Sequence, residues 1–165
     1  MKKWILLVLV SGLFVLACKK SSTNTNQPCT YDPCALKAPD AEVQKYKDTL
    51  AAHGISTSNL TQQCSGLLYQ IIDTGKGTKI TACNTVTLNY DGRFNDSTGA
   101  RFDSSGFTSN LSFLIYGFLD GVPLIRNGGH IHLFVPPTLG YGSQAYSTIP
   151  ANSNLYFDIH VTDVQ

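Results

Sequence analysis

The sequence predicts an α+β fold in which an antiparallel sheet half-wraps around a short helix, with an amphipathic helix ahead of the sheet. Three observations predict it. Apolar and polar residues alternate in several runs separated by turn signals, which is typical of half-buried strands. Residues 115–122 have Gly121 near their end and Pro123 directly after them, as expected of a short helix. Residues 39–54 carry apolar side chains at helical spacing.

The first helix is predicted within residues 39–54, with Asp40 near its start and Gly54 just beyond its end. The apolar positions on one face of this helix are Val43, Tyr46, Leu50 and Ala51. A helix of this length is marginal alone, so we expect its apolar stripe to pack against the domain that follows.

The strands are predicted from their period-2 pattern and from the turns between them. Residues 67–72 precede a turn at 74–77, and residues 127–129 form another turn. The alternating apolar positions are Val86, Leu88 and Tyr90, then Ile131, Leu133 and Val135, then Leu155, Phe157, Ile159 and Val161. Each such strand turns one face to the core and the other to water. No internal repeat is present.

The 165 residues suffice for one core after an N-terminal leader is set aside. We divide the chain into a signal peptide (1–17), a lipidated polar tether with cysteines (18–38), a helical extension (39–65) and one catalytic or binding domain (66–165). The formal net charge is +1 and no run of Lys or Arg follows the leader, so no nucleic-acid partner is expected.

The N-terminus is predicted to direct export. Lys2 and Lys3 precede an apolar run at residues 4–16, and Ala17 stands directly before Cys18. This arrangement resembles the bacterial lipoprotein box, with Val15 where that box most often has Leu. The resemblance implies that Cys18 carries the lipid and that the mature protein is anchored to a membrane of the bacterial cell envelope, facing the periplasm, without crossing it.

The same residues allow two alternatives to the lipoprotein box. One is an ordinary signal peptide with a chance cysteine. The other is a membrane span, which is disfavoured because a span needs ~20 apolar residues and this run is shorter. Residues 19–27 are polar and are expected to act as a disordered tether.

Four further cysteines are present, and export to an oxidising compartment permits disulfides. They are Cys29, Cys34, Cys64 and Cys83. Three pairings are possible, and we lean towards Cys29 with Cys34 or with Cys64 without choosing between them. Their spacing lacks the paired short loops of a structural zinc site, and without a Cys-x-x-Cys motif a redox function is the weaker alternative.

Several separated motifs occur in a fixed order between residues 66 and 165. They are Tyr90-Asp91-Gly92, Arg101-Phe102-Asp103-Ser104-Ser105, Val135-Pro136-Pro137, Gly140-Tyr141-Gly142, Ile149-Pro150 and Leu155-Tyr156-Phe157-Asp158. In this order and spacing the chain resembles the FKBP-type peptidyl-prolyl cis-trans isomerases. The resemblance implies the fold given above and a pocket that binds X-Pro segments of unfolded or partly folded exported proteins, and also macrocyclic inhibitors.

The resemblance also implies which residues form the pocket. The expected catalytic residues are Tyr90, Phe102, Asp103, Ile115, Tyr141 and Phe157, and the expected substrate-binding residues are Leu111, Phe118, Ile149 and Tyr146. The Ile115 N–H and the Tyr141 hydroxyl would bind substrate carbonyls, and Asp103 would orient the rim. A structural alternative for Asp103 is a carboxylate that caps the turn before Ser104.

Three departures from the family pattern are visible. Phe118 replaces the tryptophan that commonly forms the floor of the pocket. The segment between Phe113 and Ile115 is shorter than usual, which leaves the position of the Ile115 N–H open. The loop at 143–148 is about one residue short, so Tyr146 matches only loosely.

The implied chemistry requires neither a cofactor nor a metal, because rotation about an X-Pro bond makes no new bond. An isomerase is therefore the first hypothesis. A binding module or chaperone of the same fold with little turnover is the alternative, and the shortened segment before Ile115 favours it.

Three histidines invite a metal site but are predicted to be solvated strand residues. His130, His132 and His160 occupy alternating positions that should face water, and no acidic or cysteine ligand stands beside them in the sequence.

Overall fold

A computed structural model describes residues 29–95 and 99–165. The predicted signal peptide, Cys18 and the polar tether up to residue 28 lie outside the described residues. The elements in order are α1 (Asp40–Ala52), β1 (Thr61–Gln62), β2 (Leu68–Asp73), β3 (Thr85–Phe94), β4 (Arg101–Asn110), α2 (Tyr116–Gly121), β5 (His130–Val135) and β6 (Leu155–Val164). Within the described residues, no helix is both long enough and apolar enough to span a membrane.

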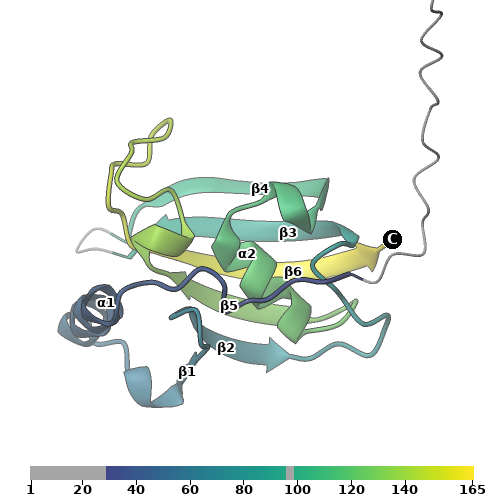
Figure 1. The fold of residues 1–165 in the computed structure, drawn as a ribbon, viewed down its shortest axis with the longest axis horizontal. Coiled ribbons are helices and arrows are strands. Elements are labelled where there is room, and N and C mark those ends of the chain that lie inside the picture. Colours follow the sequence, from purple (N-terminus) through teal and green to yellow (C-terminus); the bar gives the residue numbers. More distant parts are fainter. Residues whose placement is uncertain (1–28, 96–98) are drawn as a thin grey trace, which may run out of the picture.

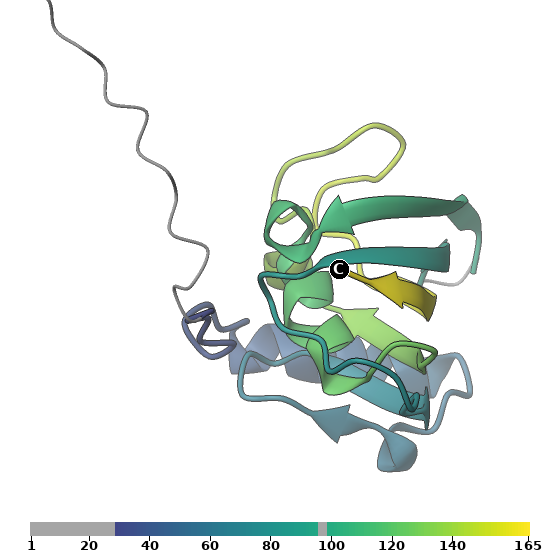
Figure 2. The ribbon, with the colours of Figure 1, turned by 90° about the vertical axis from the view of Figure 1, so that its right-hand side faces the viewer.

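The strands form one six-stranded sheet in the order β1-β2-β5-β6-β3-β4, and every neighbouring pair is antiparallel. The short helix α2 lies across one face of this sheet (Figure 1). The connection from β5 to β6 rises beside β4 in both views (Figure 1, Figure 2). The predicted α+β fold, an antiparallel sheet around a short helix, is confirmed.

The core lies between the sheet and α2. Nine of the ten alternating apolar positions predicted for three strands are buried, as in Leu88, Leu133 and Ile159, whereas Tyr90 is only partly buried. Two glycines let α2 approach β5 closely: a Cβ on Gly117 would lie 2.6 Å from a Val135 methyl, and one on Gly121 would lie 2.5 Å from a Leu133 methyl. Helix α2 is thereby fixed directly on the strand that it covers.

Helix α1 packs on the domain, as its apolar stripe predicts. Val43, Tyr46 and Leu50 are buried, but the fourth predicted position, Ala51, is exposed at the C-terminal end of the helix. The Tyr46 hydroxyl donates to the Leu155 carbonyl (2.7 Å) and accepts from the Asn95 side chain (3.0 Å).

A carboxylate also joins α1 to the connection between β5 and β6. The Glu42 carboxylate accepts hydrogen bonds from the backbone N–H and the hydroxyl of Thr138, both at 3.0 Å. Thr138 belongs to the 3₁₀ turn at Pro137–Leu139. The helical extension is thus part of the folded body.

Strand β4 was not predicted from the period-2 pattern. Its sequence is rich in Ser, Thr and Gly, and most of its residues are exposed. It pairs with β3 along nearly its whole length, from Asn110 opposite Thr85 to Arg101 opposite Arg93. Its strand conformation therefore depends on backbone pairing at the sheet edge and not on buried side chains.

The disulfides pair differently from the sequence-based preference. Cys29 is bonded to Cys83 and Cys34 to Cys64, so pairing Cys29 with Cys34 or Cys64 was wrong. The reason is the path of the chain ahead of α1, which passes in front of the sheet near α2 (Figure 1). This path brings Cys29 to the segment before β3 and Cys34 to the segment before β2.

The three histidines also differ from prediction. His130 and His132 are half-buried, and only His160 is exposed. The premise that no acidic ligand stands beside them was wrong, because Asp158 on β6 lies among all three imidazoles. The pairing of β5 with β6 brings the carboxylate there, which the linear sequence does not show.

Candidate functional site

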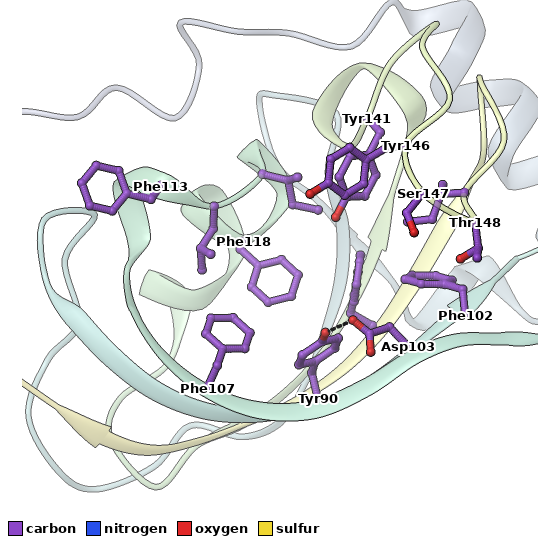
Figure 3. A pocket seen from close by; sticks show the side chains of 14 residues that line it. Tyr90, Phe102, Asp103, Phe107, Phe113, Phe118, Tyr141, Tyr146, Ser147 and Thr148 are labelled. Atoms are coloured by element: carbon purple, nitrogen blue, oxygen red, sulfur yellow. Dashed lines mark hydrogen bonds between the residues drawn. The ribbon is translucent and has the colours of Figure 1, made fainter.

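A cavity of about 650 Å³ opens between the sheet and the loops that follow β4 and β5. Its sheet side is formed by β3, β4 and β6, and its other side by α2, the segment before α2 and the loop around Tyr141 (Figure 3). The residues that line it are Tyr90, Phe102, Asp103, Phe107, Phe113, Leu114, Ile115, Phe118, Tyr141, Tyr146, Ser147, Thr148, Ile149 and Phe157.

Four aromatic rings form the base of the cavity. Phe118 from α2 and Phe157 from β6 are both buried and meet edge to face, with ring centroids 4.8 Å apart. Phe102 and Tyr90 flank Phe157 at 5.6 and 6.1 Å. Edge-to-face packing of this kind holds each ring in one orientation. The base is therefore a rigid apolar surface of the size of a small ring.

Gly92 explains how two of these rings come so close to β3. A Cβ at this position would lie 2.8 Å from two atoms of the Phe102 ring and 3.2 Å from the Phe157 ring. No side chain larger than hydrogen fits without moving them.

The polar part of the rim is a phenol–carboxylate pair. The Tyr90 hydroxyl donates to the Asp103 carboxylate (Figure 3), and the other Asp103 oxygen accepts from the Ser104 N–H at 2.8 Å. Burial, together with the hydrogen bond and the charge of Asp103, raises the pKa of Tyr90. The phenol therefore stays protonated at neutral pH and holds the carboxylate in place. Asp103 thus contacts both the rim and the turn at Ser104.

Ile115 directly precedes α2 and has an extended backbone conformation. Its carbonyl accepts the first helical hydrogen bonds, from the N–H groups of Phe118 and Leu119. Across residues 29–95 and 99–165, no acceptor for the Ile115 N–H is found. Ile115 itself lines the cavity, so its N–H is a candidate donor for a ligand there.

Tyr141 stacks on Tyr146 with ring centroids 4.8 Å apart and nearly parallel planes, and both phenols point towards the cavity (Figure 3). Burial raises the pKa of Tyr141, and the neighbouring Tyr146 and Asp103 add to the rise. A neutral phenol donates a hydrogen bond at any physiological pH. The cavity thus has two donors, from Ile115 and Tyr141, above an aromatic base.

Nine of the ten predicted site residues line the cavity, and Leu111 does not. Leu111 has no exposed surface and packs in the core, because the 3₁₀ turn at Leu111–Phe113 points it inward. In this turn the Asn110 side chain accepts from the Ser112 N–H at 3.0 Å. The shortened segment is therefore a closed turn that leads into Leu114 and Ile115.

Sequence reasoning missed five lining residues: Phe107, Phe113, Leu114, Ser147 and Thr148. Phe107 could have been predicted from the sequence, because it follows Asp103 by four residues in β4 and its side chain therefore lies on the same face of the strand. Its ring meets Tyr90 edge to face at 5.6 Å. Phe113 is 84% exposed at the mouth of the cavity, and no periodic pattern marks it.

Comparison with known proteins identifies the family. The family profile described as FKBP-type peptidyl-prolyl cis-trans isomerase matches residues 76–162. FKBP-type peptidyl-prolyl cis-trans isomerase FkpA of Escherichia coli (strain K12) is 35% identical over 132 residues, which cover 76% of this chain and 46% of that protein. A probable FKBP-type isomerase of Haemophilus influenzae is 41% identical over 106 residues, or 61% of this chain and 43% of that protein.

Solved structures agree with the sequence comparison. The crystal structure of FkpA from Escherichia coli superposes with a TM-score of 0.66 at 32% identity, covering 76% of this chain and 58% of that chain. A peptidyl-prolyl cis-trans isomerase from Pseudomonas syringae pv. tomato gives 0.64 at 23% identity over 78% of this chain and 98% of that chain, which supports the fold alone.

The chain belongs to the FKBP-type peptidyl-prolyl cis-trans isomerase family. The resemblance drawn from the sequence motifs is confirmed at this level. The chain spans about half the length of the curated relatives that it matches.

Proposed function

We propose that this protein is a peptidyl-prolyl cis-trans isomerase that accelerates rotation of X-Pro bonds in unfolded or partly folded exported proteins. The observation that carries the proposal is the aromatic cavity with two free donors at its wall, in a chain of this family. An X-Pro bond rotates in tens to hundreds of seconds unaided, over a barrier of ~18–20 kcal/mol.

The residues would act by shape and hydrogen bonding, without covalent chemistry or a cofactor. Phe102, Phe118 and Phe157 would hold the proline ring and keep water from the amide, which weakens the planar form relative to the twisted one. The Ile115 N–H would bind a carbonyl of the substrate. Tyr141 would donate a second hydrogen bond, and Ile149 with Tyr146 would close the side of the cavity. Lowering the barrier by ~5–8 kcal/mol corresponds to roughly four to six powers of ten in rate.

Asp103 would act on the rim. Its hydrogen bonds from Tyr90 and the Ser104 N–H support a positioning role in which the carboxylate fixes the Tyr90 ring beside Phe157. The apolar cavity would also accept macrocyclic inhibitors of the rapamycin type. We further propose that Cys18 is lipidated and anchors the domain in the bacterial cell envelope, facing the periplasm.

Turnover on a short X-Pro peptide tests the proposal. Phe102→Ala and Tyr141→Phe should each lower kcat/KM by about tenfold or more, because the first removes a wall and the second a donor. Tyr156→Phe is the matched control, since Tyr156 alternates with Phe157 along β6 and therefore faces away from the cavity. Equal activity in all four proteins would contradict the assignment of the cavity.

A second candidate function is a chaperone or binding module with little turnover. It is favoured by Phe113, Tyr146 and Tyr116, which are 84%, 60% and 45% exposed near the mouth of the cavity or just beyond it. Exposed aromatic side chains of this kind bind apolar segments of unfolded chains. A macrocyclic inhibitor that occupies the cavity distinguishes the two functions. Suppression of client aggregation that survives the inhibitor would assign binding to the exposed aromatics, whereas its loss would assign it to the cavity.

A further inference from the structure

The face of the sheet that points away from the cavity carries four potential metal ligands. Side chains alternate along a strand, so Asp158 faces opposite to the cavity residue Phe157. His130 pairs with His160 across β5 and β6, and His132 pairs with Asp158. The two adjacent pairs form a square of three imidazoles and one carboxylate.

The side chains converge on the carboxylate. Nε2 of His130 lies 2.7 Å from one Asp158 oxygen, and Nε2 of His160 lies 3.5 Å from the same oxygen. Nε2 of His132 lies 3.6 Å from the other oxygen. The ligand atoms of His130, His132 and Asp158 all lie within 4.8 Å of one another.

The surroundings leave these groups free to bind a cation. Asp91 lies opposite Asp158 on β3, but its carboxylate is already paired with Arg93 and Arg101. An imidazole nitrogen binds a metal ion through its lone pair.

We propose that His130, His132 and Asp158 bind a divalent transition-metal ion of the zinc class, with His160 as the fourth ligand. Imidazole and carboxylate together suit Zn²⁺, whereas Mg²⁺ and Ca²⁺ prefer all-oxygen sites. Ligands at ~2.0–2.1 Å from a tetrahedral zinc lie roughly 3.3 Å apart. The widest ligand spacing, at most 4.8 Å, therefore closes by up to about 1.5 Å through side-chain rotation, while the 2.7 Å contact between His130 and Asp158 opens slightly. The backbone of β5 and β6 stays held by the sheet.

With His160 as a fourth protein ligand the site would be a closed structural site, whereas three protein ligands would leave one coordination position open. His160 stacks on His130 with ring centroids 3.7 Å apart, and its side chain is 54% exposed. An exposed imidazole is free to turn so that its Nε2 completes the tetrahedron. A metal in this position cross-links β5 to β6 on the face opposite the cavity, and the proposal does not depend on the isomerase activity.

Titration calorimetry of chelator-treated protein with Zn²⁺ tests the site directly, with Mg²⁺ as the ion that should not bind. The expected result is saturable binding of one Zn²⁺ per chain and a rise in the unfolding temperature on Zn²⁺ addition. Asp158→Asn and His132→Gln should each weaken Zn²⁺ binding by about tenfold or more, as loss of metal-site partners does. Folding of each variant is checked by its near-UV circular dichroism.

Two matched controls lie outside the square. His53→Gln removes an exposed imidazole after α1, and Asp163→Asn removes an exposed carboxylate on the same strand as Asp158. Both should bind Zn²⁺ as the parent does. The absence of saturable Zn²⁺ binding, or equal affinity in the parent and in the Asp158→Asn and His132→Gln variants, would overturn the proposal and leave the cluster as a hydrogen-bonded ladder between two strands.

Discussion

Removal of the Tyr46 hydroxyl tests whether α1 is an integral part of the fold. Tyr46 is fully buried, and its hydroxyl joins α1 to two places in the sheet region, the Leu155 carbonyl and the Asn95 side chain. Tyr46→Phe keeps the ring and creates no large cavity. The substitution removes the hydroxyl that pairs with one buried acceptor, the Leu155 carbonyl, and with one buried donor, the Asn95 side-chain amide.

The magnitude follows from these two groups. A buried polar group that loses its partner costs about 1–3 kcal/mol, so two such groups should lower the free energy of unfolding by about 2–6 kcal/mol in Tyr46→Phe. Urea unfolding of the disulfide-intact protein measures this difference.

Tyr69→Phe serves as the control, because Tyr69 is only partly buried and its hydroxyl has no hydrogen-bond partner in the described part of the chain. The control should change the free energy of unfolding by less than about 0.5 kcal/mol. If Tyr46→Phe lost no more than the control, α1 would not be docked through its buried face, and the reasoning would be refuted.

Three further predictions concern the buried acid, the disulfides and the cavity. Asp120 is 2% exposed and accepts a hydrogen bond from the Tyr31 hydroxyl, and its burial raises the pKa of its carboxyl in the folded protein. The protonated carboxyl therefore contributes fully to stability below the unfolded-state pKa of about 3.9. This contribution is lost as the pH rises through the higher folded-state pKa. The stability of Asp120→Asn relative to the parent should therefore increase between pH 4 and pH 7. A difference in urea midpoint between variant and parent that is the same at both pH values would contradict this. Replacing Cys29 and Cys83 by Ser opens a link between residues 54 positions apart and should lower the free energy of unfolding by about 4 kcal/mol in urea. An unchanged free energy of unfolding would contradict this. Gly92→Ala should displace the Phe102 and Phe157 rings and lower X-Pro turnover by roughly tenfold or more while far-UV circular dichroism is kept, and an unchanged kcat/KM would show that ring placement is not limiting.

The sequence predicted the parts of the fold that bury a regular apolar pattern. Leu88, Leu133 and Ile159 each belong to a set of apolar residues at every second position, and all three are buried as expected. Strand β4 escaped prediction because its stability comes from pairing with β3, which leaves no apolar period. Ala51 was misplaced because a small residue in the last turn of a helix fits either face.

The candidate site was predictable where its residues belong to ordered motifs, and less so where it depends on local chain geometry. Tyr90, Phe102 and Phe157 follow from motif order, and all three line the cavity. Leu111 was expected in the site but lies in the core, because a 3₁₀ turn stabilised by the Asn110 side chain rotates it inward and leaves Phe113 exposed.

Contacts between distant segments were beyond sequence reasoning. The bond of Cys29 to Cys83 depends on how the segment before α1 crosses the molecule, which no spacing of cysteines reveals. The convergence of His130 and Asp158 likewise depends on the register of β5 against β6.

Exchange NMR on a short X-Pro peptide with a catalytic amount of the protein measures whether this cavity accelerates X-Pro rotation. Both disulfides should be verified first, and near-UV circular dichroism should show a folded protein. The account predicts exchange far faster than the uncatalysed tens to hundreds of seconds, and return to the uncatalysed rate when a macrocyclic inhibitor fills the cavity. An uncatalysed rate in the presence of correctly folded protein would contradict the account and assign the cavity to binding alone.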